Sequence, residues 1–293
     1  MADHLARAIA AEGTISGLAV VSTALADDAR RRHGTLPTAT AALGRALSAA
    51  LLLAATLKRD ERLSLEFAGD GPLGGILADA TPDGRVRGCV RRPATHLPPR
   101  RGKLDVGGAL GRGRLCVIRV PLEGEQIYRS IVPLASGEIG DDVAHYLAHS
   151  VQIPSVVGLG VFVDVHGAVV AAGGYLLQTM PGATDDTVRA LESRVGRVSS
   201  PSTLVREHAD AGEMLAALLA PFGPEMLGDY DVRFACRCDG ERARRAVLAM
   251  GRAEIERALT EDGGIEAVCE FCNASYRLDA EAVQALLRRA ARS

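Results

Sequence analysis

The chain has 293 residues, of which 47% are hydrophobic and 24% are charged, as in globular proteins, and it is long enough for two or three compact units. Its 34 lysine and arginine residues nearly balance its 36 aspartate and glutamate residues, so the molecule lacks the positive field that draws proteins to phosphate backbones. We therefore expect neither a disordered chain nor a nucleic-acid partner.

The N-terminal residues 1–13 scatter acids and bases among alanines and show no signal-peptide pattern. The most apolar run, Ala46–Leu57, spans 12 residues, whereas a membrane-crossing helix needs roughly 20. We expect a cytoplasmic protein with no membrane partner. In that compartment thiols stay reduced, so clustered cysteines indicate metal or redox chemistry.

Residues 1–181 are expected to form one domain of mixed helices and strands. A strand over Ile15–Thr23 precedes a helix over Ala24–His33, and a long alanine-rich helix follows over Thr38–Lys58. Further strands are expected at Leu63–Phe67, Ile76–Ala80, Arg85–Val90, Leu115–Pro121, Gln126–Leu134, Val156–Val165 and Ala168–Gln178. A turn is expected at Glu123–Gly124, and a helix at Asp141–Ser150. The fold class is thus α+β, with a mixed, largely antiparallel sheet packed with helices.

A helical period begins at Asp185 and is expected to continue to about Leu227. Residues 182–230 are therefore predicted to form a helical connector, and its apolar stripes must be covered by another surface. Residues 231–293 are predicted to form a small C-terminal module, with helices over Glu241–Ala249, Arg252–Leu259 and from Ala280 onwards.

Two close pairs of cysteines, separated by 30 residues, mark the C-terminal module. Each pair can supply one edge of a tetrahedron of thiolates about 2.3 Å from a metal ion, so we expect one zinc ion per chain. The module is too small to fold on apolar burial alone, and we expect it to unfold without the ion. The predicted ligands are Cys236, Cys238, Cys269 and Cys272, whereas Cys89 and Cys116 are expected to fill the core.

The first pair also indicates redox chemistry. In an extended Cys-x-Cys segment the two α-carbons lie about 6.6 Å apart, so a disulfide between Cys236 and Cys238 would require the backbone to bend. Oxidation of two metal-bound thiolates would release the ion and unfold the module locally. The spacing also fits a constitutive zinc-ribbon adaptor, and a thiol-disulfide oxidoreductase whose nucleophile is Cys269 or Cys272.

Short motifs along the chain stand in a fixed order, ending with the cysteine pattern. They are Gly71-Pro72-Leu73, Arg87-Gly88, Tyr146 with Ser150-Val151-Gln152-Ile153-Pro154-Ser155, and Ala172-Gly173-Gly174-Tyr175-Leu176-Leu177-Gln178 followed by Pro181. In this order they resemble the redox-regulated 33-kilodalton heat-shock chaperone family over essentially the whole chain. Two positions depart from it, with Val151 where the family usually has an acid and Ser16 where arginine is common.

This resemblance implies an ATP-independent holdase, not an enzyme, that binds unfolding client proteins under oxidative stress. Its reduced, zinc-bound form would be inactive. The resemblance pairs Cys236 with Cys238 and Cys269 with Cys272 on oxidation, with loss of zinc, unfolding of the module and the connector, and formation of a homodimer. The four cysteines are the only site residues that it assigns.

Overall fold

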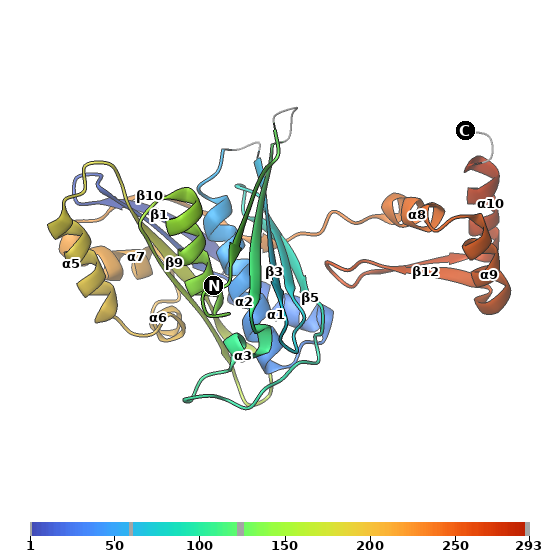
Figure 1. The fold of residues 1–293 in the computed structure, drawn as a ribbon, viewed down its shortest axis with the longest axis horizontal. Coiled ribbons are helices and arrows are strands. Elements are labelled where there is room, and N and C mark those ends of the chain that lie inside the picture. The colour runs from blue at the N-terminus through green and yellow to red at the C-terminus, as the bar shows by residue number, and fades with distance from the viewer. Residues whose placement is uncertain (1, 59–60, 122–125, 291–293) are drawn as a thin grey trace. The chain divides into compact units, whose positions relative to one another are not determined.

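The chain folds into two compact units, Met1–Ala235 and Cys236–Ser293, and the computed structural model describes residues 2–58, 61–121 and 126–290 (Figure 1). The structure is of the α+β class, as predicted. The expected turn at Glu123–Gly124 lies outside the described residues.

The first unit contains two sheets. The first sheet has the strand order β10-β1-β2-β9-β8, all antiparallel, and the second has the order β11-β5-β4-β3-β6-β7, antiparallel except for β11 with β5. The strands of the first sheet are β1 (His4–Ala10), β2 (Ile15–Val21), β8 (Ser155–Val163), β9 (Val169–Thr179) and β10 (Glu225–Asp231). Those of the second are β3 (Glu61–Gly69), β4 (Ile76–Ala80), β5 (Arg85–Val90), β6 (Gly113–Pro121), β7 (Tyr128–Pro133) and β11 (Arg233–Phe234).

Helix α2 (Pro37–Ala54) forms the centre of the first unit and packs against strands of both sheets. By length and composition it could cross a membrane, but 89% of it is buried inside the protein, which is the pattern of a core helix. It ends four residues before the predicted Lys58. There the Thr56 hydroxyl donates to the Leu53 carbonyl at 2.7 Å, a local bond that competes with helix continuation.

Three smaller helical segments surround this core. Helix α1 (Thr23–His33) ends at Gly34, whose φ of 60° is the left-handed conformation common after a helix. The predicted helix Asp141–Ser150 is α4 (Ile139–Tyr146) followed by a π-helical turn, η1 (Leu147–Val151). A short helix, α3 (Val106–Leu110), was not predicted.

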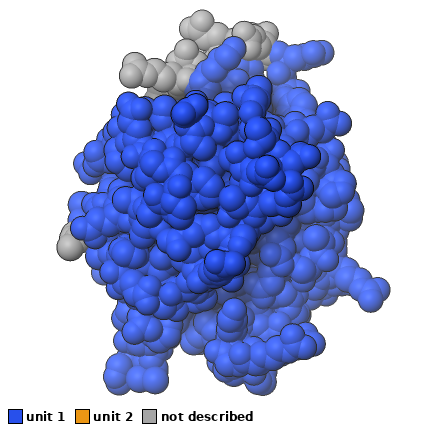
Figure 2. Space-filling view, turned by 90° about the vertical axis from the view of Figure 1, so that its left-hand side faces the viewer, with its two compact units in different colours: residues 1–235 blue, residues 236–293 orange. Residues whose placement is uncertain are grey.

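The connector helices lie on the opposite face of the first sheet from α2. Side chains alternate across a strand, so Leu5, Leu18 and Val20 face the α2 core, while Ala6, Ala19 and Val21 face the connector. Figure 2 views the side on which α5 and α7 lie in Figure 1, and the side chains there pack into a largely continuous surface. The connector helices are α5 (Asp185–Gly196), α6 (Pro201–Glu207), α7 (Ala211–Leu219) and the 3-10 turn η2 (Ala220–Phe222).

The end of the connector differs from the prediction. The helical period was expected to reach Leu227, but the chain becomes strand β10 from Glu225 onwards. This strand pairs with β1, from Ile9 opposite Glu225 to His4 opposite Asp231. Hydrogen bonding to a distant strand, and not the helical pattern of the local sequence, decides the conformation of this segment.

The second unit has a small core of its own. The buried apolar side chains that form this core are Val247, Ile255, Ile265, Leu278 and Val283. The predicted helices are α8 (Gly240–Ala249), α9 (Arg252–Asp262) and α10 (Ala280–Ala290), and an unpredicted hairpin joins β12 (Gly264–Val268) to β13 (Ser275–Asp279). The contacts of residues 182–235 place them in the first unit, so the role of residues 182–230 as a separate redox-sensitive connector stays a prediction.

Candidate metal centre

The first cysteine pair lies in the segment between β11 and α8. Cys238 directly precedes Asp239, the N-cap residue of α8, and Cys236 lies two residues earlier. The Asp239 carboxylate accepts a hydrogen bond from the Arg242 amide at 2.7 Å. This cap satisfies one of the amides left without a partner at the helix start. The start of α8, and with it the end of the Cys-x-Cys segment, is thereby fixed.

The second pair lies in the tight loop between β12 and β13. The Cys269 amide donates to the Ala274 carbonyl at 2.9 Å, and the Asn273 amide donates to the Cys269 carbonyl at 2.8 Å. Asn273 has a φ of 58°, a left-handed conformation that asparagine tolerates better than most residues. The loop thus turns Cys269 and Cys272 towards the same point.

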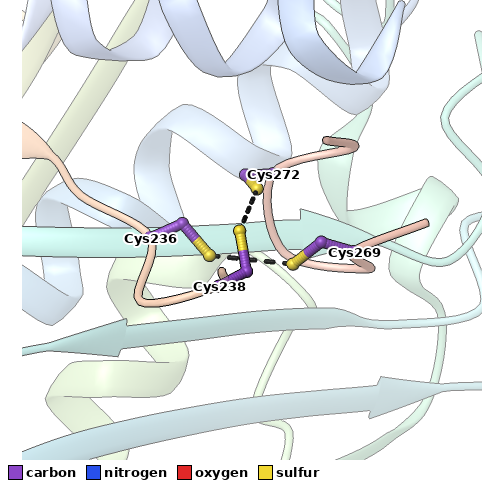
Figure 3. A group of neighbouring side chains, drawn as sticks. All are labelled: Cys236, Cys238, Cys269 and Cys272. Atoms are coloured by element: carbon purple, nitrogen blue, oxygen red, sulfur yellow. Dashed lines mark hydrogen bonds between the residues drawn. The ribbon is translucent and has the colours of Figure 1, made fainter. Parts of the chain in front are cut away.

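The four sulfur atoms form one cluster (Figure 3). All lie within 4.8 Å of one another. The Sγ atoms of Cys236 and Cys269 are 3.7 Å apart, and those of Cys238 and Cys272 are 3.3 Å apart. Four sulfurs placed tetrahedrally about 2.3 Å from one ion would lie about 3.8 Å from each other. The predicted set therefore comes together with a geometry that could hold a metal ion.

Burial and hydrogen bonding around the cluster shift the pKa values of its thiols in opposite directions. Burial raises the pKa of Cys269 and of Cys272. Neighbouring sulfurs raise the pKa of Cys272 further, whereas at Cys269 the Cys236 sulfur raises the pKa and the Cys272 sulfur lowers it. Backbone amides of Phe271 and Cys272 donate to the Cys269 sulfur, and the Ala274 amide donates to the Cys272 sulfur, which favours the thiolates. A divalent cation would add the positive charge that ionises all four thiols.

Tyr276 is a further residue of this site. Its hydroxyl donates to the Cys238 sulfur at 3.1 Å, and that bond raises the pKa of Tyr276 to about 12. Sequence reasoning missed this residue because its place depends on the β12–β13 register, in which Tyr276 stands opposite Ala267. An aromatic hydroxyl four residues after the last cysteine was the available signal.

The other two cysteines fill the core, as predicted. Cys89 and Cys116 are 3% and 1% exposed in strands of the first unit. The Cys116 sulfur accepts a hydrogen bond from Arg129 Nε at 3.4 Å. Among the described residues, the four-cysteine cluster is the one group of three or more metal-type ligands close enough to share an ion.

The fold and the site define an α+β protein with a C-terminal four-thiol site that could hold a metal ion. Comparison with known proteins then identifies the family. The family model described as Hsp33 protein matches residues 3–279. The chain belongs to the Hsp33 family, as the sequence motifs predicted.

Full-length relatives agree with this assignment. The 33 kDa chaperonin of Symbiobacterium thermophilum is 49% identical over 286 residues, which cover 97% of this chain and 96% of that protein. The 33 kDa chaperonin of Bacillus subtilis is 41% identical over 286 residues, with coverage of 97% and 98%. The crystal structure of the 33 kDa chaperonin (heat shock protein 33 homolog) from Thermotoga maritima has a TM-score of 0.93 at 32% identity, and covers 100% of both chains.

Proposed function

We propose that this protein is a cytoplasmic, redox-regulated holdase that binds unfolding client proteins without ATP. The four-cysteine cluster is its switch, and residues 182–230 are the connector that the switch releases. The observation that carries the proposal is the clustering of four oxidisable thiols in a unit with a very small apolar core. A unit of this kind depends on its metal for folding.

In the reduced protein, Cys236, Cys238, Cys269 and Cys272 hold one zinc ion. Zinc is the metal whose structural sites are typically tetrahedral and built from thiolates, and it has no redox chemistry of its own that would compete with that of the sulfurs. When bound, it supplies the positive charge that keeps the four sulfurs ionised. It also joins the Cys236–Cys238 segment to the β12–β13 loop, so the ligands act as a cross-link within the second unit.

Oxidation by peroxide removes ligands two at a time. One thiolate takes up an oxygen atom from peroxide to give a sulfenic acid, with release of hydroxide. A second thiolate then attacks that sulfur, and the S–S bond forms with release of another hydroxide. Each disulfide thus accounts for two electrons and two lost ligands.

The disulfide pairing rests on the family resemblance. Two sulfur contacts in the structure, Cys236 with Cys269 at 3.7 Å and Cys238 with Cys272 at 3.3 Å, run between the two pairs. The proposed bonds, within Cys236–Cys238 and within Cys269–Cys272, close much shorter loops. Peptide mapping of the oxidised protein under non-reducing conditions tests this: crosswise disulfides as the main product would contradict the pairing.

The first unit supplies a hidden client-binding surface. Connector side chains such as Leu191, Met214 and Leu218 are buried against the apolar face of the first sheet. Detachment of the connector would expose both this helical stripe and the sheet face beneath it. Apolar patches of this kind bind partially unfolded proteins and also favour self-association, so we propose a homodimer in the oxidised state.

One experiment tests the switch directly. The reduced, zinc-loaded protein is treated with peroxide at elevated temperature, while zinc release, thiol content and suppression of client aggregation are followed together. We expect the three signals to change together in the wild type and in a Cys89→Ala, Cys116→Ala control, and Cys269→Ser to break the link between peroxide and activity. Equally strong suppression by the fully reduced, zinc-bound wild type would contradict the proposal.

Two other classes of function predict different results. A zinc-ribbon adaptor would keep its ion under peroxide. A thiol-disulfide oxidoreductase would turn over a disulfide substrate in its reduced state, with Cys269 or Cys272 as nucleophile. The relatives reported above are named chaperonins and not enzymes, which supports a protein without catalytic activity.

A further inference from the structure

A cavity in the first unit, separate from the cysteine cluster, has three cationic side chains from one short segment in its lining. Its volume is about 590 Å³, within the range of roughly 300 to 1,000 Å³ typical of ligand pockets. The starts of α3 and α4, part of β8 and the first residue of α6 line it, together with Arg45 of α2. The three cationic side chains are those of Arg100, Arg101 and Lys103, which precede α3 in the chain.

These three residues belong to one tight turn, residues 100–103, which we call the cationic turn. Arg100 and Lys103 are joined by two backbone hydrogen bonds, in which each amide donates to the other carbonyl, at 2.8 and 3.0 Å. The two residues between them, Arg101 and Gly102, have φ of 52° and 74°. A two-residue hairpin turn with both central residues left-handed favours Asn, Asp or Gly at the first of them. Arginine is therefore an unusual choice at this position.

The charges of the cationic turn are placed where they disfavour the turn itself. Like charges that stand directly opposite each other across a hairpin are destabilising, and Arg100 and Lys103 stand in this relation. All three cationic side chains are exposed, and none has an acidic partner among the residues that the structure describes. Residues held in unfavourable backbone conformations cluster at ligand sites. Three unpaired cations gathered in such a turn indicate a missing anion.

The carboxylates of the cavity wall already have partners. Glu138 forms an ion pair with Arg45, so these two charges offset each other. Asp105 accepts an amide from the first turn of α3 at 2.9 Å, and Asp141 accepts the Ser136 hydroxyl at 2.9 Å. Among the described lining residues, three cations and two carboxylates remain, so the excess charge is positive and lies at the cationic turn.

The chemistry of the lining favours phosphate groups. Guanidinium groups bind phosphate oxygens through two parallel hydrogen bonds, and lysine binds phosphate as a point charge. Three cations within four residues suit a ligand that carries several negative charges close together. None of the described lining residues is aromatic, so the wall offers no ring on which a nucleotide base could stack.

We propose that this cavity binds a short chain of phosphate groups, for which triphosphate is the representative ligand. Arg100, Arg101 and Lys103 bind its oxygens. Because the wall lacks a stacking surface, the free inorganic chain is favoured over the same group carried by a nucleoside. All of the described lining residues lie in the first unit, so binding requires neither the metal nor oxidation of the cysteines.

The test is calorimetric titration of inorganic tripolyphosphate into the reduced, zinc-loaded full-length protein. We expect one site per chain, weaker binding of ATP and no measurable binding of sulfate. Zinc content is measured after the titration, because triphosphate itself binds metal ions. Absence of tripolyphosphate binding, or equally tight binding of sulfate, would overturn the proposal. Tighter binding of ATP would overturn the preference for a free chain and assign the site to a nucleotide.

Substitutions in the cationic turn locate the site. Arg101→Asn gives the Asn-Gly sequence that this turn favours, so thermal stability should equal or exceed that of the wild type while affinity for tripolyphosphate falls about tenfold or more. The double variant Arg100→Gln, Lys103→Gln should abolish measurable binding. Arg112→Gln is the control, because Arg112 is also exposed but lies outside the cavity lining. Unchanged affinity in the turn variants, or an equal loss in Arg112→Gln, would refute the assignment.

Discussion

The four sulfurs of the metal centre differ in what surrounds them. Cys269 and Cys272 receive hydrogen bonds from backbone amides of their own tight loop, so their donors are fixed by the β12–β13 hairpin. Cys238 receives a hydrogen bond from a side chain, the Tyr276 hydroxyl. Because outer hydrogen bonds orient metal ligands and tune them, this residue offers a way to change the proposed switch without removing any of the four cysteines.

Tyr276→Phe should weaken metal binding while leaving all four ligands in place. Loss of an outer hydrogen bond typically costs 10- to 100-fold in metal affinity, so we expect an effect of about this size and faster zinc release under peroxide. Competition with a chromophoric chelator measures the affinity. Tyr128→Phe, in the exposed part of β7, should match the wild type, and wild-type affinity in Tyr276→Phe would exclude a role for this bond.

The clustering of the four cysteines could be predicted from sequence because each pair is local and cysteine is rare in the chain. The spacing within each pair is short enough for both sulfurs to reach one ion, whatever the fold around them. Tyr276 could not be predicted in this way, since its contact with Cys238 spans 38 residues and depends on a hairpin register. The sulfur contacts within the cluster likewise follow from how the two loops meet.

At the scale of elements, the connector rests on the sheet at positions where glycine leaves room. A Cβ added at Gly160, in β8, would lie 2.2 Å from the Ser202 amide nitrogen at the start of α6. Because that neighbour is backbone, it cannot turn aside as a flexible side chain could. The close approach of α6 to β8 therefore requires glycine at this position.

Gly160→Ala should push α6 away from the sheet and activate the protein partly without oxidation. Overpacking of this kind costs about 1–3 kcal/mol. This cost reduces the free energy by which the connector packs against the sheet. Suppression of client aggregation by the reduced, zinc-bound variant is the measurement. Gly196→Ala, where a Cβ meets nothing within 4 Å, is the control and should stay inactive; an inactive reduced Gly160→Ala protein with wild-type stability would contradict this account.

The docking of α7 should weaken in acid. The carboxylate of Asp210, the N-cap of α7, accepts a hydrogen bond from the Glu213 amide at 2.9 Å. This bond is the main reason that the pKa of Asp210 lies below its ordinary value of 3.8, and His4 from β1 assists it. Since the folded-state pKa is lowered, the stabilisation is fully present above the unfolded value and is lost as pH falls through the folded one.

Asp210→Asn keeps an oxygen that can accept the Glu213 amide bond but cannot titrate. We expect the wild type to lose hydrogen-exchange protection in α7 as the pH drops below about 4, and the variant to show a flatter dependence. Asp210→Ala should lose about 0.5–2 kcal/mol at every pH, as is usual for a missing cap. Identical pH profiles for the wild type and Asp210→Asn would assign the acid effect to other groups.

Elements with a local signal were predicted well, and elements defined by distant pairing were not. Helices such as α1 and α8 have clear ends, and hairpins such as β4–β5 have a turn signal between strands. Strands β1 and β10 pair with each other from opposite ends of the first unit, so neither stretch alone indicates a strand. The β12–β13 hairpin alternates apolar and polar residues, with Ile265 opposite Leu278 and Ala267 opposite Tyr276, but each strand has only five residues and the sequence prediction missed it.

At the scale of the whole molecule, the two units differ in how they are stabilised. The first has a large continuous core around α2 and both sheets, and a second core beneath the connector. The second has a core cluster of only five buried apolar residues around its hairpin and helices. A structural metal contributes an apparent 10–16 kcal/mol or so in small domains, which can decide folding in the second unit but is not required in the first.

Removal of the metal under reducing conditions should therefore unfold one unit and spare the other. After chelation in the presence of a thiol reductant, we expect amides of residues 236–290 to lose hydrogen-exchange protection, while those of β3, β4 and β6 keep it. The reductant matters because it separates loss of the ion from formation of disulfides. Re-addition of zinc should restore protection, and a Cys272→Ser variant should resemble the chelated protein even with zinc present. Full protection of residues 236–290 in the metal-free, reduced protein would mean that the unit folds without its ion, and oxidation would then have no means of unfolding it by releasing zinc.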